Sequence, residues 1–239
     1  MIERAELLGP PTKADAAYVE LRNQILRGTL QPGSRVDYAF LSDSFGLSIT
    51  PLREALRRLE ADHLVIRNAH RDVVIAPLTR DEARDLLTVR EELEALGARL
   101  AAEHMTAEEI AAARDLMSQE DDVGAIHYLR SAGIPVSASG SLIVNRAFHR
   151  MMYCGSHNQV LIQYRDSISA RVERYAMVSR GLRQSPYDPG PHRLLHAELL
   201  AAIEDHDAER AERLTRAHEH SDDVDFVELI FGPEVAGSS

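Results

Sequence analysis

At 239 residues the chain is long enough for two domains of ordinary size, and its apolar share of 44% excludes general disorder. Its formal net charge of −11 lies almost entirely after residue 80, since residues 1–80 hold nearly equal numbers of acidic and basic side chains. The first part of the chain is therefore free to bind nucleic acid. No apolar run approaches the roughly 20 residues that span a bilayer. The start of the chain lacks a signal peptide's apolar core, and a single cysteine, Cys154, excludes an internal disulfide framework, so we expect a cytoplasmic protein with no membrane attachment.

The first third of the chain predicts two helices and a turn before its most informative segment. Apolar residues recur at helical spacing over Lys13–Arg27, and a Pro-Gly turn follows at residues 30–34. A second helix is expected over Tyr38–Phe45, ended by Gly46 in the left-handed conformation. These elements precede a third helix and two short strands.

The third helix follows the segment Ser48-Ile49-Thr50-Pro51, with Thr50 expected as its N-cap and Pro51 as its first residue. Its apolar positions are Leu52, Ala55, Leu56 and Leu59. Two β-type runs over residues 64–67 and 73–76 then flank a polar tip, as in a hairpin. This order of elements is that of a winged helix-turn-helix.

Polar side chains on the third helix point to DNA. Arg53 and Arg57 are four residues apart on the expected outer face, where they can reach phosphates or the O6/N7 edge of guanine. Ser48 and Thr50, at the start of the helix, are placed to bond backbone phosphates. An ordinary amphipathic helix with a solvated arginine face is the alternative. The turn before this helix and the hairpin after it favour DNA reading.

The rest of the chain predicts helices separated by Gly and Pro. We expect a mainly α fold, in which a winged helix-turn-helix (three helices plus a β-hairpin) precedes an all-α helical-bundle effector domain. The predicted domains are residues 1–78 for DNA binding and 79–231 for ligand or metal binding and dimerisation, followed by a tail at 232–239.

Several polar side chains occupy stripes that should face the core of this bundle. Arg90 shares a stripe with Leu86 and Val89, and its role is either to bind an anion or to form an internal ion pair. On later helices, His149 lies one turn after Asn145, and His196 and His218 each share a face with leucines. A single buried histidine is more commonly a hydrogen-bonded core residue. Three of them on three helices suggest a site within the bundle.

Residues 41–59, LSDSFGLSITPLREALRRL, resemble the winged helix-turn-helix of the GntR family of bacterial regulators, whose usual run is similar to GVSRTPVREAL. The preceding LQPG belongs to the same pattern. Two positions depart from it: Ile49 replaces the usual Arg, and Asp72 replaces the usual Gly at the wing tip. Because both positions commonly touch DNA in that family, the operator sequence is left open.

Residues from about 79 to 231 resemble the FCD effector domain of the FadR-like branch of that family. The segments that carry the resemblance are LTVREELEALGARLAAE, NRAFH, HAELLAAIEDHDAERA and RAH. In many such domains an Asp and three His bind a divalent metal, which implies His149, His196 and His218 here. The Asp position is Asn145, whose neutral carbonyl should weaken a Zn²⁺ or Ni²⁺ site. His192 is an alternative ligand.

Together these patterns predict a ligand-responsive transcription regulator, expected to act as a repressor. A homodimer would bind a pseudo-palindromic operator, and a small organic acid bound near Arg90 would control its affinity for DNA, with a divalent metal in the same domain. The chain is not expected to be an enzyme. A metal-dependent enzyme and a pure metal sensor, both using the histidines, are the alternatives.

Overall fold

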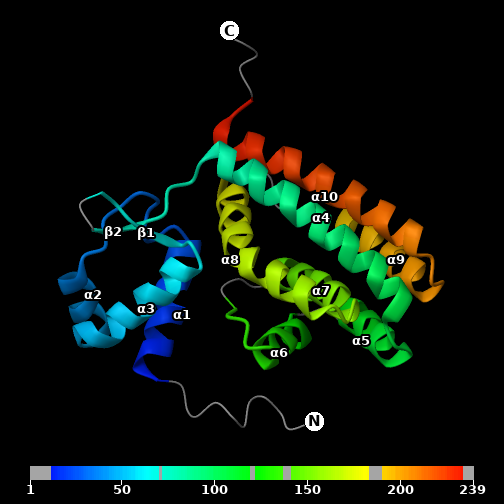
Figure 1. The fold of residues 1–239 in the computed structure, drawn as a ribbon, viewed down its shortest axis with the longest axis horizontal. Coiled ribbons are helices and arrows are strands. Elements are labelled where there is room, and N and C mark those ends of the chain that lie inside the picture. The colour runs from blue at the N-terminus through cyan, green and yellow to red at the C-terminus, as the bar shows by residue number, and fades with distance from the viewer. Residues whose placement is uncertain (1–11, 70–71, 119–121, 137–140, 183–189, 234–239) are drawn as a thin grey trace. The chain divides into compact units, whose positions relative to one another are not determined.

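A computed structural model describes residues 12–69, 72–118, 122–136, 141–182 and 190–233 (Figure 1). The chain divides into two compact units, one made of Met1–Thr79 with Ala170–Val178 and the other of Arg80–Ser169 with Ser179–Ser239. The expected fold class is confirmed: a winged helix-turn-helix precedes an all-α part. None of the helices in the described ranges is long and apolar enough to cross a membrane.

The first unit contains the winged helix-turn-helix. Its elements are α1 (Lys13–Leu26), α2 (Tyr38–Phe45), α3 (Ile49–Ala61), β1 (Val65–Arg67) and β2 (Val73–Ile75). Helix α1 begins with a capping box between Thr12 and Asp15, and α2 ends at Gly46, whose φ of 60° suits glycine. The two strands pair antiparallel, with Val65 opposite Ile75. Apolar faces of all these elements form one core that includes Leu21, Leu52, Leu59 and Leu64.

The start of α3 differs from the sequence prediction. Its N-cap is Ser48 and its first residue is Ile49, so the assignment of Thr50 as the cap was wrong. Pro51 therefore lies within the first turn rather than at its first position. Proline is tolerated there because the first four backbone N–H groups of a helix have no partner within it. The hydroxyl of Ser48 makes no capping hydrogen bond, so it is not used in closing the helix end.

Helix α8 (Gln159–Leu182) contributes residues to both units. Within the first unit, Glu173 accepts a hydrogen bond of 2.6 Å from Arg22 of α1, and both side chains are buried. Arg174 donates to the carbonyl of Ala76, and Ala170 joins the apolar core around α3. The first unit is thus built from residues before 80 and from a segment about 90 residues later.

The second unit is a bundle of helices. Its elements, besides the first part of α8, are α4 (Arg80–His104), α5 (Ala107–Ser118), α6 (Val123–Ser131), α7 (Ser141–Gly155), α9 (Gly190–Glu204) and α10 (Ala208–Phe231). Helices α4 and α10 lie side by side along most of their length (Figure 1). Helix α7 packs on α4 at Gly97, next to Tyr153.

The buried stripe of α4 differs in part from the one expected. Leu86 and Arg90 are buried as predicted, but Val89 is 48% exposed, so its assignment to the inner face was wrong. The buried positions are instead mostly alanines such as Ala95 and Ala98, together with Glu94. Helix α4 contacts α7, α9 and α10, and small side chains let several helices approach one long helix closely.

Candidate functional site

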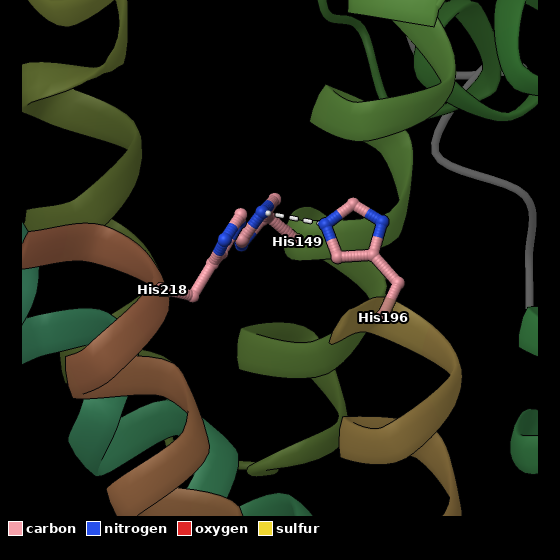
Figure 2. A group of neighbouring side chains, drawn as sticks. All are labelled: His149, His196 and His218. Atoms are coloured by element: carbon pink, nitrogen blue, oxygen red, sulfur yellow. Dashed lines mark hydrogen bonds between the residues drawn. The ribbon is translucent and has the colours of Figure 1, made fainter. Parts of the chain in front are cut away.

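Three buried histidines from three helices meet inside the second unit (Figure 2). His149 lies on α7, His196 on α9 and His218 on α10, and each is at most 5% exposed. One ring nitrogen from each lies within 4.8 Å of the other two. Figure 2 shows the three rings turned toward one another. The residues singled out in the sequence are thus brought together by the fold.

The spacing of the ring nitrogens suits a metal ion. The Nε2 atoms of His149 and His196 are 3.2 Å apart. Two nitrogens bound to a tetrahedral zinc at about 2.0–2.1 Å lie roughly 3.3 Å from each other. Imidazole nitrogen is also a favoured ligand of Zn²⁺ and Ni²⁺. The donor set and this distance therefore fit a divalent ion bound by the three histidines.

Ring packing holds the imidazoles in place. Phe148 stacks on His196 with ring centroids 4.2 Å apart. The rings of His149 and His218 are nearly parallel, with an interplanar angle of 6° and centroids 5.3 Å apart. Such contacts restrict the side-chain rotamers, so little conformational freedom is left to lose when a ligand binds.

A buried carboxylate lies behind His149. Glu94 of α4 is 4% exposed, and its Oε2 is 2.6 Å from Nδ1 of His149. A carboxylate this close accepts a hydrogen bond from Nδ1–H, which leaves the lone pair of the neutral imidazole on Nε2. Nε2 is the atom that faces His196. Glu94 thus turns the ligating atom of His149 toward the other histidines.

Two buried arginines share the other oxygen of Glu94. Arg165 of α8 donates to Oε1 from Nε at 2.8 Å and from Nη2 at 2.5 Å, and Arg90 donates from Nε at 3.3 Å. Burial alone would raise the pKa of Glu94, but the positive charges of Arg165 and Arg90 and the hydrogen bond from His149 outweigh it and hold that pKa well below its usual value. Glu94 is therefore ionised, and the trio of Glu94 and two arginines carries one net positive charge.

Two buried polar atoms near this group have no hydrogen-bond partner among the described residues. One is Nη1 of Arg165, whose other nitrogens bond Glu94. The other is Oδ1 of Asn145, which lies one turn before His149 on α7. A buried polar atom without a partner costs about 1–3 kcal/mol, so a bound water, ion or ligand that bonds these two atoms would be stabilised by that amount.

In the first unit, the side chains expected to read DNA are exposed on α3 and at its start. Ser48, Thr50, Arg53 and Arg57 all face solvent, while Leu52 and Leu56 between them are buried. The neighbouring Arg58 instead pairs with Asp15 at 2.6 Å and lies over the ring of Tyr18, which ties it to α1. Helix α3 therefore presents a polar face that the unit's own packing does not use.

Comparison with known families identifies both parts of the chain. Residues 85–221, more than half of the chain, match the model of the FCD domain, and residues 13–75 match the model of bacterial regulatory proteins of the gntR family. The chain belongs to the GntR family, in the branch that carries an FCD domain. It is a DNA-binding transcription regulator with a helical effector domain, as the sequence patterns predicted.

Individual relatives support this classification. The chain is 28% identical over 213 residues to the HTH-type transcriptional repressor GlaR of Escherichia coli (strain K12), which covers 84% of this chain and 90% of that protein. It is 29% identical over 202 residues to the Nta operon transcriptional regulator of Aminobacter aminovorans, covering 84% and 89%. Among solved structures, E. coli McbR/YncC shares the fold, with a TM-score of 0.69, 21% identity and coverage of 92% and 99%.

The sequence interpretation missed two residues of the site, Glu94 and Arg165. Glu94 could have been found, because it follows Arg90 by four residues and so shares its helical face. Arg165 shares a helical face with the apolar Leu161 and Ile168, which indicates burial, but only the packing of α8 against α4 brings it to Glu94. The alternative ligand His192 lies among the residues whose side chains the structure does not describe.

Proposed function

We propose that the chain is a cytoplasmic repressor whose affinity for operator DNA is set by a small organic acid bound in the second unit beside a divalent metal. The observation that carries this proposal is the convergence of His149, His196 and His218 next to the cationic group of Arg90 and Arg165. The repressor assignment draws on the name of the E. coli relative.

The three histidines would hold Zn²⁺ or Ni²⁺, with Asn145 as a weak fourth ligand through its buried Oδ1. Neutral imidazoles and a neutral amide bring no negative charge to a doubly charged ion. A carboxylate from the effector would supply that charge and complete the coordination. Metal and acid would therefore bind cooperatively.

The arginines would hold the acid's other oxygens. Arg90, which the sequence predicted as the anion-binding residue, already donates a hydrogen bond to Glu94. Nη1 of Arg165, by contrast, is buried and donates to none of the described residues. A guanidinium in this position can bond a carboxylate oxygen strongly. Both arginines would contribute positive charge, and Arg165 would donate the direct hydrogen bond. An anion site of this kind distinguishes an acid-responsive regulator from a pure metal sensor.

A homodimer would present two copies of α3 to a pseudo-palindromic operator. Arg53 and Arg57 would contact base edges or phosphates, and Ser48 and Thr50 would bond the backbone of the DNA. The exposure of all four side chains supports these roles. The relatives of the chain are named as transcription regulators, and the proposal assigns no catalytic role to the residues around His149.

The test is a gel-shift titration of the full-length protein against DNA from its own promoter. We expect Arg53→Ala to weaken specific binding, since each lost contact costs about 1–3 kcal/mol and a dimer loses two. Arg213→Ala, which removes an exposed arginine of α10, is the charge-matched control and should bind as the wild type does. Equal affinity of Arg53→Ala and wild type at the same salt concentration would contradict the assignment of α3.

The same titration tests the effector site. Operator affinity of the zinc-loaded protein should change on adding organic acids one by one, and Arg165→Ala should abolish the response. A response to Zn²⁺ with no response to any acid would identify a pure metal sensor instead.

A further inference from the structure

The three contacts of Glu94 give it a position that neither metal nor anion binding alone explains. Its Oε2 lies 2.6 Å from the imidazole of His149, and its Oε1 accepts hydrogen bonds from Arg165 and Arg90. The carboxylate therefore lies between the side chains assigned to the metal and those assigned to the acid. The charge on Glu94 acts on both sets at the same time.

We propose that Glu94 is the positioning residue that links the two halves of the effector site, strengthening metal binding at His149 while limiting anion binding at Arg165 and Arg90. This inference rests on the proposed function. It assigns opposite effects to one carboxylate, because that carboxylate supports the ligating imidazole and also neutralises the cations that an acid needs.

The effect on the metal follows from the contact with His149. A carboxylate that accepts the Nδ1–H bond fixes the imidazole with its lone pair on Nε2 and makes that nitrogen a better donor. Removing such a partner commonly lowers metal affinity about 10–100-fold. Because Nε2 of His149 faces His196 at 3.2 Å, a change of tautomer or ring orientation at His149 would disturb the shared site.

The effect on the anion follows from charge. Glu94 and the two arginines together carry one net positive charge, and Glu94→Gln would raise this to two. In a buried site, where charges are poorly screened, the added charge favours a bound carboxylate. Nη1 of Arg165 donates to none of the described residues, and the neutral amide of glutamine would hold the Nε and Nη2 donors less strongly than the carboxylate does.

The two effects make a signature that simple loss of structure does not produce. We expect metal-stripped full-length Glu94→Gln to bind Zn²⁺ about 10–100-fold more weakly than wild type in calorimetric titration. The same protein without metal should bind trifluoroacetate, a fluorine-labelled carboxylate probe, more tightly, as followed by its ¹⁹F line width. Damage to the fold would instead weaken the binding of both Zn²⁺ and trifluoroacetate.

Two further variants keep the test decisive if Glu94→Gln folds poorly. Glu94→Asp keeps the negative charge but is one methylene shorter, so Zn²⁺ binding should fall while trifluoroacetate binding stays at the wild-type level. Glu92→Gln removes an exposed carboxylate of the same helix, which pairs with Arg216, and should change neither affinity.

The outcomes separate the inference from the function on which it rests. Wild-type protein that binds Zn²⁺ and the carboxylate, combined with a Glu94→Gln variant that loses both or neither, overturns the role of Glu94 alone. Wild-type protein that binds neither ligand overturns the proposed effector site and this inference with it. Opposite changes in the two affinities support the inference.

Discussion

Gly97 lies where α4 and α7 approach most closely, and its replacement by alanine tests the packing that holds the effector site. A Cβ added at Gly97 would lie 2.8 Å from Cβ and 3.1 Å from Cα of Tyr153. Carbon atoms pack best at about 3.5–4.0 Å, so Gly97→Ala requires the helices to separate by roughly 1 Å. Neither of these Tyr153 atoms can rotate away, because both are fixed by the backbone of α7.

The magnitude follows from two opposing effects. Alanine stabilises a helix interior by about 1 kcal/mol relative to glycine. Forcing an extra carbon into a packed interior costs about 1–3 kcal/mol, and the backbone contact places this case at the upper end. We therefore expect Gly97→Ala to lower the free energy of unfolding by about 1–2 kcal/mol. Zn²⁺ affinity should fall as well, since α4 carries Glu94 and α7 carries His149.

The assay is urea denaturation of the full-length protein followed by circular dichroism. Gly181→Ala on α8 is the matched control, because no described atom lies within 4 Å of the added Cβ, and it should be neutral or slightly stabilising. If Gly97→Ala is as stable as Gly181→Ala, α4 and α7 do not approach as closely at Gly97 as 2.8 Å requires.

Three other predictions concern the rest of the chain. Glu173→Gln leaves Arg22 buried without its carboxylate and should lower the free energy of unfolding in denaturant titration by about 3–5 kcal/mol. The double variant Arg22→Met/Glu173→Leu should recover most of this loss. A loss under about 1 kcal/mol in Glu173→Gln would refute the role of the pair. The Asp15 pKa is lowered from 3.8 to about 2, mainly by hydrogen bonds from Thr12, so its stabilisation is present above about pH 4 and is lost as the pH falls toward 2. Because the Asp15 side chain is 41% exposed, solvent screening should keep the effect under about 1 kcal/mol. The Tm difference between wild type and Asp15→Asn should vanish at the acid end, and a difference that stays constant with pH would contradict this account. Burial raises the pKa of the Cys154 thiol, so iodoacetamide at neutral pH should alkylate the folded protein far more slowly than the protein in urea, and equal rates would show an accessible thiolate.

The first unit was predictable in detail because its signals are local. Gly46 marks the end of α2, and the apolar positions from Leu52 to Leu59 face the core as their spacing requires. The predicted N-cap of α3 was wrong by two residues, because proline is acceptable anywhere in the first turn of a helix. The contribution of α8 to this unit was not predictable, since the pair of Arg22 and Glu173 joins residues 151 positions apart.

The candidate site was predictable in its ligands but not in its surroundings. His149, His196 and His218 were found because histidine is unusual on an apolar stripe and because their motifs resemble those of FCD domains. The arginine that lies closest to Glu94 is Arg165, and its helical spacing with Leu161 and Ile168 indicates a buried face without showing which residue it meets. Helix packing decides which long polar side chains meet, and a pattern within one helix does not record it.

The central claim is that one divalent ion binds each chain through the three histidines, and zinc calorimetry on metal-stripped full-length protein tests it most directly. We predict a single site per chain that is lost in His149→Ala and in His196→Ala and retained in His127→Ala, which removes an exposed histidine of α6. Zinc binding by His149→Ala and His196→Ala that equals that of the wild type would contradict the claim.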